Sequence, residues 1–474
     1  MSAEIFKMLE AAAFTNPFSD ERMEIDREIV GAPEGASWDE MQQPLFQCLE
    51  KNIQGLDHVQ ELVARERGGQ SGRKERPYSV SVLFYVFYQV QEKFDALIEE
   101  QIAAGDASCK APFAFDCLEM LRGYGFPRDE ACRYVGIFYQ IRRAYYFISK
   151  GLVGDSACMK SLRAQLWDNV FTHDISWYER CLWNRMEDFS TLLLGETGTG
   201  KGAAAAAIGR SGFIPFNPKT QTFAESFTRA FISINLSQYP EALIESELFG
   251  HRKGAFTGAV ENHDGIFARC SPHGAIFLDE IGDVAVPIQI KLLQVLQERT
   301  FSPVGSHEKL RFEGRVIAAT NKSIDGLRRE GQFRDDFYYR LCSDLITVPP
   351  LRQRIRETSS ELEDLVHHLM QRICGSEWKF PMAGKLKESV GKNYGWPGNV
   401  RELEQAIRRT MLTGTYSVTE PEPVQDLESI SLTAKELVAK YCSDLYATYG
   451  NYGEVARRTG LDWRTVKKHV DATR

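Results

Sequence analysis

The segment TLLLGETGTGKGAAAAAIG, at residues 191–209, constrains the fold of this chain more than any other. An apolar run is followed by a glycine-rich turn and then by an alanine run that favours a helix. Gly195, Gly198 and Gly200 allow the backbone to aim successive amides at an anion, and the helix N-terminus adds partial positive charge. Lys201 can then reach the outer phosphates of a nucleotide. Strand, loop and helix in this order predict nucleotide binding rather than a structural turn.

The residue after the loop lysine departs from the usual pattern, in which a serine or threonine hydroxyl binds magnesium. Gly202 has no side chain that could serve as this ligand. A later apolar run, GAIFLDEIGD, supplies an acidic pair, in which Asp279 can hold magnesium directly or through water. Glu280 can orient and polarise the attacking water. In isolation such a run is commonly a strand edge, but its combination with the upstream loop favours phosphate chemistry.

Short apolar runs alternate with helical stretches over residues 169–350. The runs TLLLGE, FISINL, GAIFLDE and RVIAAT are apolar on both faces, which is typical of parallel strands covered on both sides. We therefore expect an α/β core with a parallel sheet and helices on both faces, followed by a helical subdomain at residues 351–415. Asn235 and Asn321 come at the ends of two of these runs, and Asn321 is placed to sense the outer phosphate.

Residues 1–168 are expected to be mostly helical, with aromatic residues clustered at residues 78–102 and 134–152. We interpret these aromatic residues as core packing rather than as a ligand cage. The region contains no motif that indicates a particular chemistry.

Composition argues against several classes of protein. The net charge of −8 argues against a protein that coats nucleic acid, although a small basic module can occur in an acidic chain. The ten cysteines have no metal-ligand spacing and indicate reduced thiols. The N-terminus lacks the features of a signal peptide, and the longest apolar run, VSVLFYVFYQV, is too short for a bilayer. We therefore expect a cytoplasmic protein without a membrane partner.

A compact basic module is expected at residues 431–474, after an acidic, proline-punctuated linker at residues 416–430. Its sequence has the spacing of a helix-turn-helix, with the small Ala456 where the helices cross and Gly460 at the turn. A bare two-helix pattern is often only a structural hairpin. Asp462 can cap the second helix. The residues left to contact a DNA groove and its phosphates are Trp463, Arg464, Thr465, Lys467 and Lys468.

A series of motifs occurs along the middle of the chain in the order GETGTGKG, ESELFGHRKGAFTGA, GAIFLDEIGD, KLLQVLQERTFSPVG, AATN, GQFRDDFYYRL, VPPLRQR and WPGNVREL. Over roughly residues 165–415, this series strongly resembles the central domain of sigma-54-dependent transcriptional activators, which are bacterial enhancer-binding proteins of the AAA+ class. One hexapeptide is close to unique to that family. It consists of Gly254, Ala255, Phe256, Thr257, Gly258 and Ala259.

The resemblance implies that the chain is an ATPase with ATP and Mg²⁺ as cofactors. The family usually has glutamate after the loop lysine, so Gly202 departs from the family pattern as well. We expect hydrolysis to survive, because the loop amides, Lys201, Asp279 and Glu280 together carry most of the charge neutralisation of phosphoryl transfer. The residues implied to bind ATP are Gly195, Glu196, Thr197, Gly198, Thr199, Gly200, Lys201, Gly202, Asn321 and Arg401.

The resemblance also implies ring assemblies, usually hexamers, with ATP bound between subunits. Arg334 and Arg340 would reach the phosphates of the neighbouring subunit, where a permanently charged guanidinium stabilises spreading negative charge. One of them could instead form a surface salt bridge with Asp335 or Asp336. Arg401, in the helical lid, looks like a second sensor that couples the state of the nucleotide to the position of the lid.

Two further roles are carried over from the family. Asn235 resembles the switch residue that holds Glu280 back until the target is engaged. Glycines flank Phe256 and Thr257 and deny them regular structure, so these side chains would be displayed at a flexible tip. The resemblance names the partner of this tip as sigma-54 bound to RNA polymerase at a closed promoter.

The basic end at residues 431–474 resembles the Fis-type DNA-binding end of the same family, which implies two-fold pairing on upstream double-stranded DNA. Residues 1–168 would then be a regulatory region that restrains ring assembly. Two alternatives stay open, and neither depends on sigma-54. One is an AAA+ remodelling ATPase that acts on another protein, and the other is a hydrolysis-deficient, nucleotide-binding DNA regulator.

Overall fold

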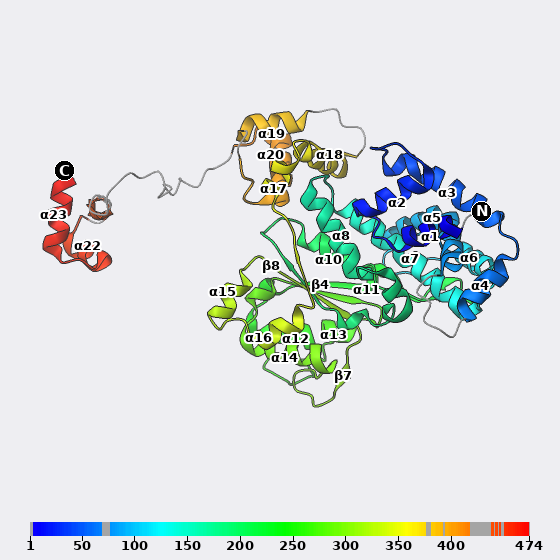
Figure 1. Cartoon of the computed structure of the whole chain (residues 1–474). Helices are drawn as coiled ribbons and strands as arrows, with labels where there is room; N and C mark the ends of the chain where they lie inside the picture. Colours follow the sequence, from blue (N-terminus) through cyan, green and yellow to red (C-terminus); the bar gives the residue numbers. More distant parts are fainter. Residues whose placement is uncertain are drawn as a thin grey trace. The chain divides into compact units, whose positions relative to one another are not determined.

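The computed structural model describes residues 3–68, 76–375, 381–391, 394–417, 438–439, 441–443, 445–446 and 450–473. The chain divides into two compact units, Met1–Tyr416 and Ser417–Arg474, both drawn in Figure 1. The linker predicted at residues 416–430 lies almost wholly outside the described residues.

A parallel five-stranded sheet forms the centre of the first unit, with the strand order β4-β5-β8-β1-β9 (Figure 1). Every residue of β5 from Ala275 to Leu278 is buried, because helices cover both faces of the sheet. The predicted α/β core with a parallel sheet is confirmed. Its strands are β1 (Thr191–Leu194), β4 (Phe231–Asn235), β5 (Ala275–Asp279), β8 (Arg315–Thr320) and β9 (Asp344–Thr347).

Alternate residues of the strands enter different hydrophobic cores. Leu192 and Leu278 face a core that is shared with the later helices of the same subdomain. Leu193 and Phe277 face a core that is shared with α10 and with the last N-terminal helices. The α-helices between β1 and β9 are α10 (Lys201–Gly209), α11 (Phe227–Ala230), α12 (Glu241–Phe249), α13 (Ile266–Arg269), α14 (Val286–Glu298), α15 (Ile324–Arg329) and α16 (Asp335–Leu341). Two small antiparallel hairpins pair β2 (Phe216–Asn217) with β3 (Thr222–Phe223) and β6 (Thr300–Phe301) with β7 (Leu310–Arg311).

The N-terminal region is helical, as predicted, and it packs directly on the sheet subdomain. Tyr139 stacks on Phe223 of the β2–β3 hairpin, with ring centroids 4.0 Å apart. The boundary expected at residue 168 falls inside α8, which belongs to the core of the sheet. Every helix within the described residues is too short or too polar to span a membrane. The helices before β1 are α1 (Ala3–Phe14), α2 (Asp20–Val30), α3 (Trp38–Gln54), α4 (Val59–Gly68), α5 (Pro77–Ala104), α6 (Pro112–Gly123), α7 (Arg128–Gly151), α8 (Ala157–Phe171) and the short α9 (Ile175–Trp177).

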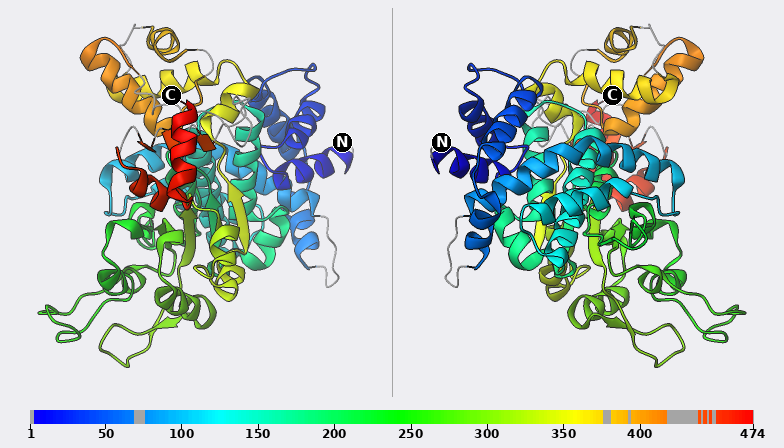
Figure 2. Two further views of the ribbon diagram at one scale, coloured as in Figure 1. Left: turned by 90° about the vertical axis from the view of Figure 1, so that its left-hand side faces the viewer. Right: turned by 90° about the vertical axis from the view of Figure 1, so that its right-hand side faces the viewer.

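A helical subdomain follows β9 and has its own core around Trp396 and Leu403. Figures 1 and 2 show it in yellow and orange at the top of the first unit. The helical subdomain predicted after the sheet is confirmed. Its helices are α17 (Leu351–Glu357), α18 (Glu361–Cys374), α19 (Met382–Val390) and α20 (Asn399–Thr413).

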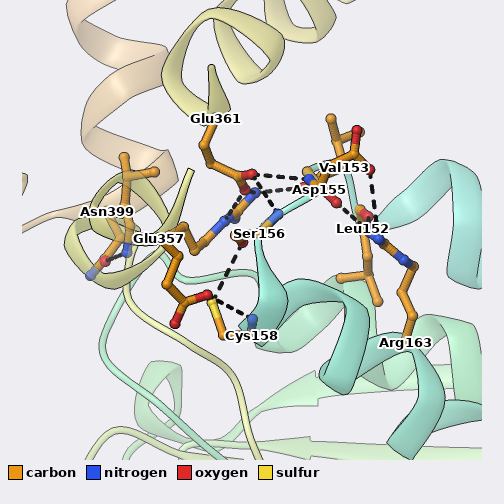
Figure 3. Close-up of polar contacts among 12 residues, drawn as sticks. Leu152, Val153, Asp155, Ser156, Cys158, Arg163, Glu357, Glu361 and Asn399 are labelled. Atoms are coloured by element: carbon orange, nitrogen blue, oxygen red, sulfur yellow. Dashed lines mark hydrogen bonds and ion pairs between the residues drawn. The ribbon is translucent and has the colours of Figure 1, made fainter. Parts of the chain in front are cut away.

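A buried ion pair joins this subdomain to α8 (Figure 3). Arg354 Nε donates to Glu361 Oε1 at 2.7 Å, and both side chains are almost fully buried. The other oxygen of Glu361 accepts the backbone N–H groups of residues 155–156, at 3.0 and 3.2 Å. Glu357 accepts the N–H of Cys158 at 2.7 Å. The two carboxylates therefore satisfy amides at the N-terminus of α8 that have no partner within the helix.

We expect Glu361→Ala to lower the free energy of unfolding of the first unit by about 3–5 kcal/mol, because Arg354 would stay buried without its carboxylate. Glu363→Ala is the matched control on the same helix. Its carboxylate pairs with Lys387 at the surface, and its loss should cost at most about 1 kcal/mol. Urea unfolding followed by circular dichroism measures both variants. Equal losses in the two variants would contradict a structural role for the buried pair.

The second unit is helical, as predicted for the C-terminus. Gly460 ends the first helix with a φ of 71°, a left-handed conformation that favours glycine. The N–H of Arg464 donates to Asp462 Oδ1 at 2.9 Å, so Asp462 caps the second helix. The helices are α22 (Tyr452–Thr459) and α23 (Trp463–Thr473), and they share a small apolar core that includes Val455, Val466 and Val470.

Candidate nucleotide site and its projecting loop

The phosphate loop joins β1 to α10 and depends on glycine at several positions. Gly198 has a φ of 80° and Gly200 a φ of 109°, conformations that residues with side chains rarely adopt. A Cβ atom on Gly198 would lie 2.3 Å from the carbonyl oxygen of Gly398, so this position also lacks space for a side chain. Lys201 begins α10, and its ammonium group lies inside the loop, where it donates to the carbonyl oxygen of Gly195 at 2.8 Å.

The carboxyl ends of β4 and β5 bring polar side chains to one edge of the sheet. Asp279 ends β5 and is the direct register partner of Asn235, which ends β4. Burial raises the pKa of the Asp279 carboxyl, and the nearby cations of Lys201 and Arg401 oppose this rise. Burial lowers the pKa of Lys201, and the carboxylates of Glu280 and Asp279 oppose that change. Asp279, Glu280 and Arg401 therefore all lie within electrostatic range of Lys201.

Glu280 and Asn321 connect the ends of β5 and β8 to the loop. The N–H of Asn321 donates to Glu280 Oε2 at 3.3 Å, and its side-chain amide donates to Thr197 Oγ1 at 2.8 Å. Glu280 has a φ of 58°, a left-handed conformation that costs a residue with a side chain about 1–3 kcal/mol. Backbone strain of this kind clusters at active sites, where surrounding contacts hold it.

Asn235 lies at the same edge of the sheet but has other partners. Its Oδ1 accepts the N–H of Ser237 at 3.0 Å and the hydroxyl of Ser237 at 2.7 Å. Among the residues that the structure describes, the hydrogen bonds of Asn235 do not include Glu280. Asn235 and Glu280 thus lie at the same edge of the sheet, but the Glu280 carboxylate accepts its hydrogen bond from Asn321.

The helical subdomain clamps the loop through Glu196. Arg352 of α17 donates to both carboxylate oxygens of Glu196, and Asn399 of α20 donates to the same carboxylate at 3.2 Å. The hydrogen bonds from Arg352 are the main cause that lowers the pKa of Glu196 to about 2. Asn399 also donates to the carbonyl oxygen of Thr197 at 3.1 Å and accepts the N–H of Leu351 at 2.8 Å.

No role was predicted for Arg352 or Asn399 from the sequence. Both lie in motifs that support the family resemblance, VPPLRQR and WPGNVREL. Their place in these motifs was the only feature of the sequence that could have marked them as functional residues. Asn399 is fully buried and has a φ of 54°, a conformation that asparagine tolerates better than most residues. Its side chain contacts the loop and α17 at once, which no local pattern in the sequence reveals.

The segment after α12 forms a loop with residues 254–259 at its tip. A short bridge between His251 and His263 closes its base. The tip is compact, because the N–H of Gly254 donates to the carbonyl oxygen of Ala259 at 2.8 Å. Phe256 is 38% exposed and lies edge-on against His251, with ring centroids 4.9 Å apart.

A second loop, residues 302–309 between β6 and β7, supports the first. Arg252 Nη2 donates to Glu308 Oε2 at 2.6 Å. A Cβ atom on Gly305 would lie 2.7 Å from the Cβ of Ala255, so the two loops are in close contact near the tip. Figure 2 shows both as green loops that project from the lower part of the first unit.

Comparison with known proteins places the phosphate loop and the projecting loop in one family. A family model described as Sigma-54 interaction domain matches residues 177–347, and one described as AAA+ ATPase lid domain matches residues 356–432. Transcriptional regulatory protein ZraR of Klebsiella oxytoca is 36% identical over 332 residues, which cover 67% of this chain and 67% of ZraR. The chain belongs to the sigma-54-dependent transcriptional activators. The predicted family and its AAA+ ATPase domain are thereby confirmed.

The activator is similar to other regulators over a smaller part of its length. Regulatory protein AtoC of Escherichia coli (strain K12) is 35% identical over 269 residues, which cover 55% of this chain and 54% of AtoC. The activator spans about half the length of the first curated relatives that it matches. Among solved structures, NtrX from Brucella abortus in complex with ATP is 20% identical with a TM-score of 0.43, over 76% of this chain and 80% of NtrX.

The two arginines expected to act on a neighbouring subunit have different partners in the activator. Arg334 is exposed and forms a bidentate pair with Asp336, with N–O distances of 3.0 and 2.6 Å. This pair is the surface salt bridge considered as the alternative. Arg340 is partly buried and donates twice to the carbonyl oxygen of Leu296, at 2.9 and 2.8 Å.

The residues expected to contact DNA lie on the exposed part of α23. All five are exposed, whereas Val466 and Val470 of the same helix are buried. These exposed residues are Trp463, Arg464, Thr465, Lys467 and Lys468.

Gly202 lies exposed in the first turn of α10, and a Cβ atom there would meet nothing within 4 Å. We expect Gly202→Glu to keep the fold and to change ATP turnover by less than about threefold, because Lys201, Asp279 and Glu280 remain in place. A phosphate-release assay on the purified activator, with Gly202→Ala as the control, measures this effect. An inactive natural protein whose turnover is restored by Gly202→Glu would contradict the expectation.

Proposed function

We propose that the activator hydrolyses ATP and uses the free energy to remodel a sigma-54 RNA polymerase closed complex, so that the promoter opens. The observation that supports this most is the short path between the nucleotide site and the projecting loop. Only a turn and α12 separate Asn235, at the end of β4, from the base of the loop at His251. A rearrangement at the phosphates can therefore reach Phe256 and Thr257 through about 14 Å of helix.

The residues at the loop support ATP hydrolysis as the source of this energy. Lys201 and the loop amides would neutralise the phosphates, and Glu280 would accept a proton from the attacking water. The carboxylate of Asp279 fits Mg²⁺, because it lies half-buried beside the phosphate loop and Mg²⁺ typically uses one or two carboxylates together with phosphates and waters. Bound Mg²⁺ would neutralise charge on the outer phosphates. Gly202 would contribute no ligand.

A ring, most simply a hexamer, would complete the site. Arg334 is exposed on its own chain and can exchange Asp336 for the phosphates of a neighbour, while Arg340 keeps a main-chain partner. A guanidinium that reaches the neighbour would stabilise charge in the transition state. The lid would respond to nucleotide through Arg401, and Asn235 would restrain Glu280 until the partner is engaged.

The exposed basic face of α23 supports binding to double-stranded DNA upstream of the promoter. Arg464, Lys467 and Lys468 would contact phosphates and base edges, and two copies would bind in two-fold fashion. These steps would take place in the bacterial cytoplasm, where RNA polymerase acts.

Transcription in a purified system tests the proposal. The activator is mixed with core RNA polymerase, sigma-54 and a supercoiled sigma-54 promoter template, and open DNA is detected by permanganate reactivity. We expect opening that requires both ATP and sigma-54 and that fails with a non-hydrolysable ATP analogue. Opening of equal extent without sigma-54 would overturn the proposal and favour a remodelling ATPase with another target.

A further inference from the structure

A cavity of about 430 Å³ lies among α1, α2, α3, α5, α7 and α8, the helices drawn from blue to blue-green in Figure 1. Its lining residues include none from the phosphate loop or from the projecting loop. The aromatic residues of this region pack in a core, as expected, and several of them also line this space. Its volume is in the range of sites for small organic molecules. The aromatic side chains in the wall include Trp38, Phe84, Phe87, Tyr88, Phe138 and Trp167.

Arg22 brings unused hydrogen-bond donors into the cavity. The residue is only 6% exposed, and its guanidinium lies 5.4 Å from the ring centroid of Trp38 and 5.3 Å from that of Phe84. Its Nε donates to Asp26 Oδ2 at 2.7 Å. Within the described residues, its two terminal nitrogens donate to no other group. Arg22 lines the cavity, so its terminal nitrogens can donate to an oxygen of a bound molecule.

Tyr88 is a second donor in the same wall. It is 8% exposed, and its ring lies 5.0 Å from that of Phe84. In the part of the chain that the structure describes, its hydroxyl has no hydrogen-bond partner. Burial raises the pKa of Tyr88 to about 12, so the hydroxyl keeps its proton at neutral pH and can donate it.

The charges around the cavity favour an uncharged ligand. Arg142 forms a bidentate pair with Asp95, with N–O distances of 2.9 and 2.6 Å. Arg76 pairs with Glu179 at 2.6 Å. Every arginine that lines the cavity thus has a carboxylate partner already, and the exposed carboxylate of Asp39 in the same lining would repel an anion.

Helix α8 links this cavity to the lid. Trp167 and Phe171 contribute its C-terminal half to the cavity wall. The N-terminus of the same helix is held by Glu357 and Glu361 of the lid, as Figure 3 shows. About 14 Å of continuous helix separates Cys158 from Trp167, so a change at one end is transmitted to the other.

We propose that this cavity binds a small, uncharged aromatic molecule that carries an acceptor oxygen such as a ketone, and that α8 reports its occupancy to the lid. The ring of the ligand lies between the aromatic walls, and its oxygen accepts hydrogen bonds from Arg22 and Tyr88. The ligand supplies an acceptor to Arg22 and to Tyr88 without adding a charge.

Three probes of nearly equal shape test the chemical class. Acetophenone has the acceptor oxygen, α-methylstyrene replaces it with a methylene group, and benzoate adds a negative charge. Calorimetric titration of the full-length activator is expected to show binding of acetophenone, with both other probes bound at least about tenfold more weakly. Equal affinity for acetophenone and α-methylstyrene, tighter binding of benzoate, or no binding of acetophenone would each overturn the proposal.

Substitutions in the cavity wall test whether acetophenone binds in this cavity. Tyr88→Phe is expected to weaken acetophenone binding by about threefold to tenfold and to leave α-methylstyrene unchanged. Tyr146→Phe, on α7 but outside the cavity lining, is the matched control and should change neither. The double replacement Arg22→Met with Asp26→Leu exchanges the buried ion pair for an apolar pair, and it should abolish the preference for acetophenone. Retained preference in both cavity variants would overturn the assignment.

Hydrogen exchange tests the connection to the lid. Saturation with acetophenone is expected to slow exchange of the amides at residues 155–158 by at least about twofold, because their hydrogen bonds to the lid open less often. Unchanged exchange at these amides despite binding would overturn the role of α8. This readout requires neither ATP nor polymerase, so its failure is distinguishable from failure of the proposed function.

Discussion

Glu280→Gln is expected to lower ATP turnover by at least about 100-fold, because an amide cannot accept the proton of the attacking water. Nucleotide affinity should change little, since Lys201 and the glycines of the loop remain. The left-handed backbone of Glu280 and its bond to the N–H of Asn321 should also persist, because glutamine offers an oxygen of the same reach. Phosphate release measures turnover, and titration with a fluorescent ATP analogue measures binding.

Glu388→Gln is the matched control for this experiment. Glu388 is an exposed carboxylate on α19 of the lid, and its replacement should leave turnover within experimental error of the natural protein. Turnover by Glu280→Gln at the natural rate would remove Glu280 from the reaction. Loss of both turnover and binding would instead assign Glu280 to the architecture of the site.

Thr257→Ala is expected to abolish promoter opening while ATP turnover stays within about twofold of the natural value. The threonine lies at the tip of the projecting loop, and the nucleotide site lies at the other end of α12. Removal of its hydroxyl leaves the hydrogen bond between Gly254 and Ala259 that keeps the tip compact. The variant therefore separates contact with the partner from ATP chemistry.

Permanganate reactivity of the promoter and phosphate release are measured on the same preparation. Thr220→Ala, in the turn between β2 and β3, is the control for the loss of a threonine hydroxyl from an exposed loop. It should open the promoter normally. Full activation by Thr257→Ala would show that the tip does not make the decisive contact with sigma-54.

Much of the nucleotide site could be predicted, because the strand, the loop and the helix that form it each depend on residues that are close together in the sequence. A glycine that adopts a left-handed turn, such as Gly198 or Gly200, is recognisable from the strand before it and the helix after it. The position of Asp279 and Asn321 at one edge of the sheet was predictable for a related reason, since the carboxyl ends of neighbouring parallel strands lie at the same edge.

The clamp on the loop could not be predicted in the same way. Glu196 is held by Arg352, which is 156 residues away, and by Asn399, which is 203 residues away. Periodicity and turn chemistry describe a few neighbouring residues and carry no information about such distant pairs. Only the folded lid, which packs against the loop, reveals why Glu196 is charged and fixed.

The N-terminal region shows the same limit. Its helices were expected, but their packing on one face of the sheet was not, and α8 crosses the boundary expected at residue 168. The hydrogen bonds of Glu361 to the start of α8 span 205 and 206 residues. Burial of these charges results from tertiary packing and has no counterpart in local propensity.

By itself, the sequence determined the strand, loop and helix of the nucleotide site, the parallel sheet, the projecting hexapeptide and the membership of a family, because these follow from residues close together in the chain. The tertiary structure alone decided which lid residues hold the loop, how α8 connects the N-terminal helices to the lid, and that a cavity with Arg22 and Tyr88 in its wall stays open among them. Hydrogen bonds across some 200 residues and gaps between packed side chains depend on the whole chain at once.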